Sequence, residues 1–169
     1  MVIIRPNAQN RIPTIRSFAE NLTDMELKIK YEDIIGRCEQ LSSFEARDKV
    51  DEAGVSRYLD IHINEIDKLL VRQYIDQARA LLEQSMERMI DNVVTRDNEY
   101  FIWAIRPDKR WKPSPTFNRH IEEALVSYAM SEWLRDKLVE RSKFYEALFT
   151  ASTGMAVKNI FTKQPPKYE

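Results

Sequence analysis

Apolar residues recur three or four positions apart over most of the chain, with short alternating runs between the periodic segments. This spacing places apolar side chains on one face of a helix. It predicts a mainly α fold, a helical bundle with a long central helix, a short strand or hairpin element and extended termini.

The first periodic segment begins near residue 23. Thr23 and Glu26 form a capping-box pattern, in which each side chain can bond a free backbone amide of the first helical turn. Apolar residues follow at helical spacing, at Leu27, Tyr31, Ile34, Cys38 and Leu41. Residues 25–31 also alternate between apolar and polar, as a strand would, so helix and strand both remain open there and we favour the helix.

The longest periodic segment follows Asn64, the predicted N-cap. Its apolar stripe comprises Ile66, Leu70, Tyr74, Ala78, Leu81, Met86, Met89 and Val93. About thirty residues would give a helix of roughly 45 Å, the spine of the fold. Before it, residues 42–52 favour a second short helix and residues 58–63 a short extended piece.

Residues 100–134 combine a strand pattern, a proline-flanked loop and a helix. Residues 100–105 are aromatic and branched, which favours a strand. Ser114 and Pro115 then fit an N-cap followed by proline at the first helical position. This helix has two apolar faces. One suffices for the core, and the second needs a further helix or another subunit, so we name a candidate subunit interface at Val126, Met130 and Trp133.

A last helical stretch covers residues 144–161, with Gly154 as an expected kink. We predict one helical domain over residues 21–161, between an extended arm of residues 1–20 and a basic, proline-containing tail of residues 162–169. The candidate arm contacts are Arg5, Arg11, Arg16, Lys163 and Lys167.

Composition agrees with this outline. The chain of 169 residues is long enough for one domain with a real core. Its three glycines argue against a many-stranded sheet, which would need frequent turns. Cys38 is the single cysteine, and we see neither a signal sequence nor the roughly 20 apolar residues of a membrane span. We expect a soluble protein made in a reducing compartment, with no membrane partner.

Charge is distributed unevenly. The net charge is +3 over residues 1–19, −8 over residues 20–99 and +4 over residues 100–169. Such asymmetry can place an acidic surface of one subunit against a basic surface of the next. Solvated helix faces that merely differ in charge would give the same pattern.

The sequence gives little support for an enzyme. His62 and Glu65 could share a helix face, but Cys38 and His120 are not at a ligand spacing near them. Cys38 falls on an apolar stripe, where a free cysteine usually behaves as a small hydrophobe. We find no glycine-rich phosphate loop or nucleophile turn. We therefore expect no catalytic residues, no metal and no cofactor.

A basic and aromatic cluster offers a second class of function. It comprises Arg106, Lys109, Arg110, Trp111, Lys112 and Arg119. A basic groove with aromatic platforms can bind a nucleic-acid strand. Trp111 between prolines can equally lock the loop onto the core, and we favour that role. The alternative function is a helical nucleic-acid-binding or regulatory protein that uses this cluster.

The order of these elements resembles small virion proteins of tailed bacteriophages and prophages, especially those of Bacteroides-type bacteria. The matching features are the segments 74–79, 100–107 and 128–134, Trp111, and a late Tyr145 before the basic end. Residues 58–89 are also similar to the start of phage head-tail connector proteins, with Ile75 and Ala78 on the matching stripe. The resemblance covers roughly residues 57–167.

The resemblance implies a mechanical function. Head-tail connector, or neck adaptor, proteins are mainly helical and form rings beneath the portal. It therefore implies a virion protein, present in the host cytoplasm during assembly, that forms a cyclic oligomer by lateral helix packing. Its partners would be the portal or adjacent neck and tail proteins, with packaged DNA near its basic residues.

Overall fold

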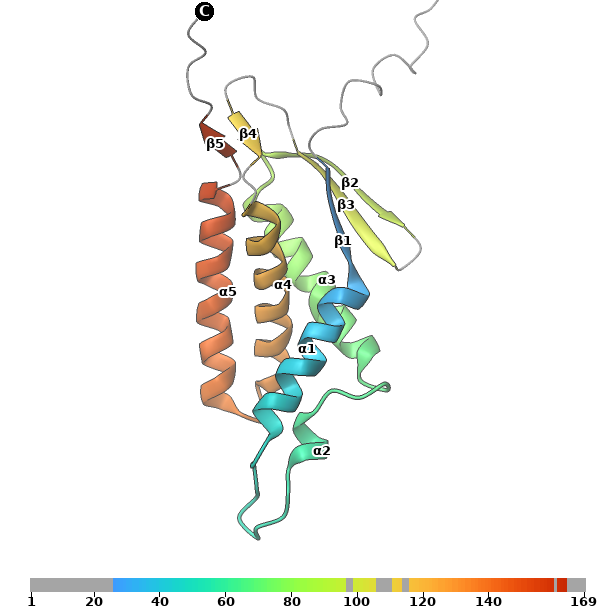
Figure 1. Cartoon of the computed structure of the whole chain (residues 1–169), viewed down its shortest axis with the longest axis vertical. Coiled ribbons are helices and arrows are strands. Elements are labelled where there is room, and N and C mark those ends of the chain that lie inside the picture. Colours follow the sequence, from blue (N-terminus) through green and yellow to red (C-terminus); the bar gives the residue numbers. More distant parts are fainter. Residues whose placement is uncertain (1–25, 97–98, 106–110, 114–115, 160, 164–169) are drawn as a thin grey trace, which may run out of the picture.

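The computed structural model describes residues 26–96, 99–105, 111–113, 116–159 and 161–163 (Figure 1). Over these ranges it has five helices, α1 (Tyr31–Ala46), α2 (Tyr58–Ile61), α3 (Lys68–Ser85), α4 (Phe117–Leu134) and α5 (Val139–Asn159). The predicted mainly helical fold is confirmed. The arm of residues 1–20 lies outside the described residues, as do Thr23 and Ser114. Neither of the two predicted caps starts its helix, because α1 follows Lys30 and α4 follows Thr116.

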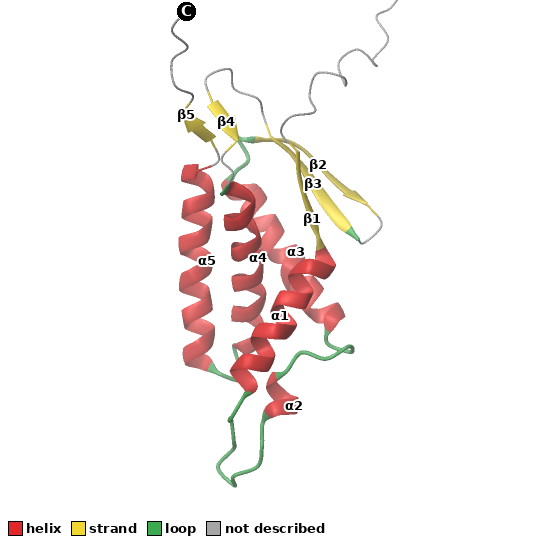
Figure 2. Cartoon of the chain, in the orientation of Figure 1, coloured by secondary structure: helices red, strands yellow, loops and turns green. Residues whose placement is uncertain are grey.

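The strands form two small antiparallel sheets at the upper end of the helices (Figure 2). A three-stranded sheet has the order β1-β3-β2, from β1 (Glu26–Lys30), β2 (Ile90–Arg96) and β3 (Tyr100–Ile105). A two-stranded sheet pairs β4 (Trp111–Pro113) with β5 (Phe161–Lys163). The strand predicted over residues 100–105 is β3 and is confirmed.

The helix favoured over residues 25–31 is wrong for residues 26–30, which form β1. This strand pairs with β3 along its length, with Leu27 opposite Trp103. Its alternation buries Leu27 and Ile29 and leaves the residues between them exposed. Sheet pairing satisfies backbone groups and buries both residues at once, so it outweighs local helix signals. Helix α1 starts only at Tyr31.

The segment between α1 and α3 also differs from prediction. α1 continues into the stretch expected to form a second helix and ends at Ala46. Residues 58–61 form the single helical turn α2 instead of an extended piece, because His62 donates its amide to the Tyr58 carbonyl at 2.8 Å. Ile61 and Ile63 are buried and anchor this segment to the core.

The long central helix is shorter than predicted. α3 ends at Ser85, and residues 90–96 leave the helix to form β2. The reason is again sheet pairing, which sets Val93 opposite Trp103. The buried residues of α3 are Val71, Ile75, Ala78 and Leu82, mostly one position along from the predicted stripe.

The last helix is longer than predicted at its start and shorter at its end. α5 runs unbroken from Val139 to Asn159, with Gly154 inside it. Phe161, expected to be helical, lies in β5. Residues 162–163 of the predicted tail belong to the same strand.

The core is centred on α4, which lies between α5 and the neighbouring helices α1 and α3 (Figure 1). Eleven of its eighteen residues are buried. One hydrophobic cluster joins it to the other four helices and the three-stranded sheet. No helix in the described ranges is long and apolar enough to cross a membrane.

Two buried tyrosines join helices through polar contacts. Tyr31, at the start of α1, donates to Asp76 Oδ1 on α3 at 2.5 Å. Tyr145 on α5 donates to Glu45 Oε1 on α1 at 3.0 Å, and Arg141 Nε donates to the same carboxylate at 2.7 Å. Burial is the largest cause that raises the pKa of each phenol to about 12.

These raised pKa values predict a loss of stability at alkaline pH. A tyrosine ionises near pH 10 in the unfolded chain, so between pH 10 and 12 the folded state binds more protons. The free energy of unfolding should therefore fall over this window, by up to about 2 kcal/mol per tyrosine. Urea unfolding at about pH 9 and about pH 11 should show a smaller fall for Tyr145→Phe than for the wild type. The exposed Tyr58→Phe is the control, and an unchanged fall in Tyr145→Phe would contradict the prediction.

Candidate assembly surface

The second apolar face of α4 is covered by the chain itself. Val126, Met130 and Trp133 are 3%, 0% and 7% exposed. The Trp133 indole Nε1 also donates to the Ile61 carbonyl at 2.7 Å. The sequence leaves two ways to cover this face, a further helix of the same chain or another subunit. In the structure, helices of the same chain cover it. The assignment of these three residues to a subunit interface is therefore corrected, and they belong to the core.

The basic and aromatic cluster lies largely where the structure gives no side-chain positions. Arg106, Lys109 and Arg110 fall outside the described residues, and Trp111 and Lys112 are placed by their backbone in β4. Arg119 is exposed in the first turn of α4. A nucleic-acid site at this cluster stays a prediction.

The arm residues Arg5, Arg11, Arg16 and Lys167 likewise lie outside the described residues. The backbone of Lys163 lies in β5, opposite Trp111 of β4. This pairing brings a predicted C-terminal arm contact beside the predicted basic cluster. The sequence alone does not indicate that these two sites lie side by side.

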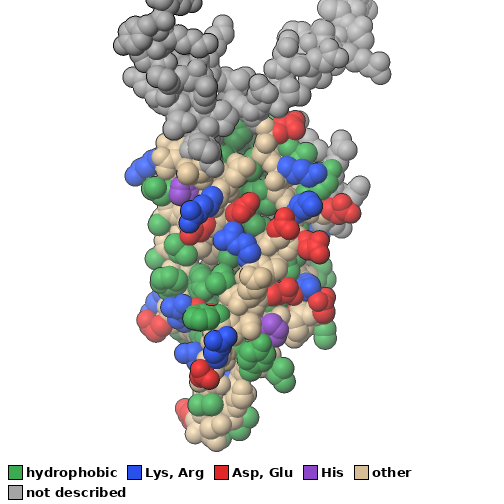
Figure 3. Space-filling model, in the orientation of Figure 1, with side chains coloured by type: hydrophobic (Ala, Val, Ile, Leu, Met, Phe, Trp, Pro, Cys, Tyr) green, Lys and Arg blue, Asp and Glu red, His purple; other side chains and the backbone are tan. Residues whose placement is uncertain are grey.

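Exposed apolar side chains gather toward the opposite end from the sheets. Of thirteen exposed large hydrophobic residues in the described ranges, eight lie between residues 44 and 70. We call these eight the apolar end, namely Phe44, Val50, Val55, Tyr58, Leu59, Ile66, Leu69 and Leu70. Figure 1 places this segment around α2 and the flanking loops, and Figure 3 shows hydrophobic side chains over the lower part of one face.

The apolar end is costly for an isolated molecule. Leu59, Ile66 and Leu69 are 86%, 89% and 69% exposed. Burying such a side chain typically contributes about 1.5–3 kcal/mol, which these three residues forgo in water. Single exposed hydrophobic residues are ordinary, whereas a concentration of them marks an interaction surface.

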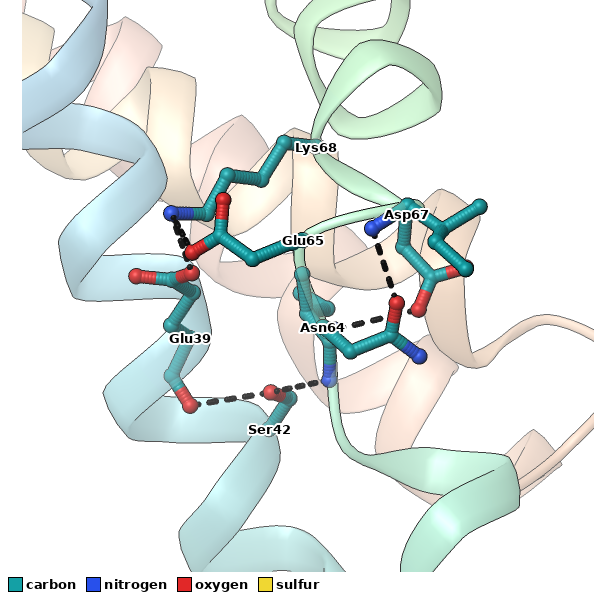
Figure 4. Close-up of polar contacts among 8 residues, drawn as sticks. Glu39, Ser42, Asn64, Glu65, Asp67 and Lys68 are labelled. Carbon is teal, nitrogen blue, oxygen red and sulfur yellow. Dashed lines mark hydrogen bonds and ion pairs between the residues drawn. The ribbon is translucent and has the colours of Figure 1, made fainter.

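Polar contacts hold the loop between α2 and α3 against α1 (Figure 4). The Ser42 hydroxyl accepts from the Ile63 amide at 2.9 Å and donates to the Glu39 carbonyl at 2.9 Å. Lys68 binds the carboxylates of Glu39 at 3.0 Å and Glu65 at 2.6 Å. The loop is thus fixed to α1 at both of its ends.

Asn64 and Asp67 shape the turn within this loop. The Asp67 carboxylate accepts from the Asn64 amide at 3.0 Å, and Asn64 Oδ1 accepts from the Ile66 amide at 2.9 Å. Such side chain to backbone bonds favour a turn over a continued helix. Asn64, predicted as the N-cap, therefore stabilises the turn before α3, and Ile66 is directed into solvent.

Charged residues accompany the apolar end. Residues 47–68 carry six acidic and four basic side chains, which leaves an acidic excess. Hydrogen bonds to Glu65 and then Glu39 raise the pKa of Lys68, so this amine stays charged at neutral pH. A partner for this end of the molecule should combine apolar side chains with basic ones.

Other parts of the described structure offer weaker candidates. In the described ranges, no group of three or more His, Cys, Asp and Glu residues could hold a metal ion. Burial raises the pKa of Cys38 to about 12, so its reactive thiolate is scarce near neutral pH. A cleft of about 630 Å³ beside α1 and α3 is lined by three acidic and three basic residues, which gives it no clear preference for an ion.

No family model, curated protein or solved structure matches the chain. A proposal of function therefore rests on the apolar end and on the sequence pattern.

Sequence reasoning missed the apolar end because it assigned Ile66 and Leu70 to a buried stripe. A usable signal was present, since α3 contains Leu69, Leu70 and Val71 in succession. Consecutive residues point about 100° apart on a helix, so a single packed face cannot hold all three. The sequence could have shown an excess of apolar residues, but not which of them would be exposed.

The polar network predicts how the loop responds to mutation. Ser42 is fully buried, so Ser42→Ala leaves the Ile63 amide without an acceptor and should lower the free energy of unfolding by about 1–3 kcal/mol. Hydrogen exchange at the Ile63 amide should accelerate. The neighbouring Ser43→Ala removes only an exposed contact with Tyr58 and should cost less than about 0.5 kcal/mol. Equal effects of the two substitutions would refute this role for Ser42.

Proposed function

We propose that this protein is a structural subunit of a tailed-bacteriophage virion, a neck or head-tail connector component that packs as a cyclic oligomer. The observation that carries the proposal is the apolar end, which concentrates eight exposed hydrophobic residues within residues 44–70. A subunit that functions by assembly needs such a surface, and its burial between copies would stabilise the oligomer. The sequence resemblance over residues 57–167 supplies the kind of assembly.

A ring subunit also needs a rigid body that transmits load between its contacts. The buried α4 and the ion pair between Glu45 of α1 and Arg141 of α5 support such a body. Because α4 is enclosed, lateral contacts between copies would use the apolar end or the outer side of α5. That side of α5 carries exposed Phe144 and Met155, which lie within about 20° of each other around the helix.

The alternative, a nucleic-acid-binding or regulatory protein, is favoured by one observation. The β4–β5 pairing gathers Trp111, Lys112 and Lys163 on one small sheet. A monomer that binds DNA with a steep dependence on salt would support this alternative, because phosphate contacts release counterions. Substituting Lys112→Glu and Lys163→Glu together should then reduce both the affinity and the salt dependence.

The connector proposal predicts an oligomer of defined rotational symmetry. The purified protein, alone and with portal particles and the neighbouring gene products, should give rings in electron microscopy. Leu59→Asp with Ile66→Asp should lower the assembled fraction at least about tenfold, because two charges would have to be buried. Leu81→Asp, at an exposed position of α3 outside both surfaces, tests whether any added charge has the same effect. A protein that remains monomeric and fails to bind any portal or neighbouring ring would sink the proposal.

A further inference from the structure

We infer that the apolar end of one copy binds residues 1–19 of a neighbouring copy. The inference deepens the proposed function and rests on it, since it names the contact through which copies associate. The proposed occupant is a segment of this same chain.

The chemistry of residues 1–19 complements the apolar end. This segment carries three arginines and no acidic residue. Its large apolar residues are Met1, Val2, Ile3, Ile4, Ile12, Ile15 and Phe18. The apolar end offers exposed Leu59, Ile66 and Leu69 beside an acidic excess over residues 47–68. Apolar side chains can pack on apolar ones while arginines meet carboxylates around them.

The position of β1 favours a neighbouring copy over the same copy. β1 and α1 run one after the other from the sheet end toward α2 (Figure 1). At about 3.3 Å per strand residue and 1.5 Å per helical residue, Glu26 lies up to about 40 Å from the end of α1. To reach the apolar end of its own copy, the N-terminal segment would need roughly twelve extended residues to span this distance.

When the sheet end of one copy faces the apolar end of the next, the N-terminal segment can reach that surface without spanning its own molecule. Such a contact joins two different surfaces, so it is heterologous and repeats from copy to copy. It closes into a ring when the rotation between copies allows closure. The loop that presents Ile66 is already held on α1 by Ser42 and Lys68, so little further ordering is needed at the receiving surface.

The test is photo-crosslinking between distinguishable copies of the full chain. Unlabelled protein carrying Ile12→p-benzoylphenylalanine is mixed with 15N-labelled protein without the probe, irradiated, digested and analysed by mass spectrometry. We expect crosslinks that join the unlabelled residue 12 peptide to 15N peptides within residues 44–70. Leu59→Asp with Ile66→Asp on the labelled copy should reduce their yield at least about fivefold, while Leu81→Asp, at an exposed position of α3 outside residues 44–70, should leave it unchanged.

A second set of variants tests the arm itself. Arg11→Glu with Arg16→Glu on the probe copy should reduce the same crosslinks even where the receiving copy is unaltered. Crosslinks that join residue 12 only to residues of the same copy would overturn the inference, because the arm would then bind its own chain. Crosslinks to labelled peptides outside residues 44–70, or none to labelled peptides, would also overturn it.

The outcome separates this contact from the proposed function. Rings that form on portal particles without the predicted crosslinks would retain the connector function and remove the arm contact. Crosslinks without rings on any portal would retain the arm contact and remove the connector function.

Discussion

The enclosure of α4 is the constraint on which the rest of the structure depends. This helix is apolar around most of its circumference, so no single neighbouring surface can cover it. α1, α3 and α5 pack around it, and the Trp133 indole extends the contact to the Ile61 carbonyl. Once α4 is covered, the positions of α2 and the loop that leads to α3 follow, because Ile61 and Ile63 are anchored in the same core.

Because the chain itself covers α4, contacts between copies must use other surfaces. A helix with two apolar faces is a reasonable candidate for a subunit contact when the chain is read alone. In the folded chain both faces are used, and hydrophobic residues remain exposed around α2 and the start of α3. The core thus removes one candidate interface, and the loop geometry set by Asn64 and Asp67 creates another.

The two ends of the molecule have different characters. The sheet end gathers strands that are far apart in the sequence, including β4 and β5 beside the predicted basic cluster. The opposite end presents an apolar surface with an acidic excess. A polarity of this kind suits head-to-tail association, in which unlike ends meet and the contact repeats.

The sequence by itself determined the elements whose pattern extends over many residues. The mainly helical class, the strand at residues 100–105 and a helix that ends at Leu134 all follow from local periodicity. Where local signals for helix and strand compete, the tertiary structure decided between them. Residues 26–30 and 90–96 have apolar patterns that suit a helix or a strand, and β3 selected the strand by pairing with both. It also decided which apolar residues stay in water, because burial depends on neighbours that are distant in the sequence, and no local pattern contains them.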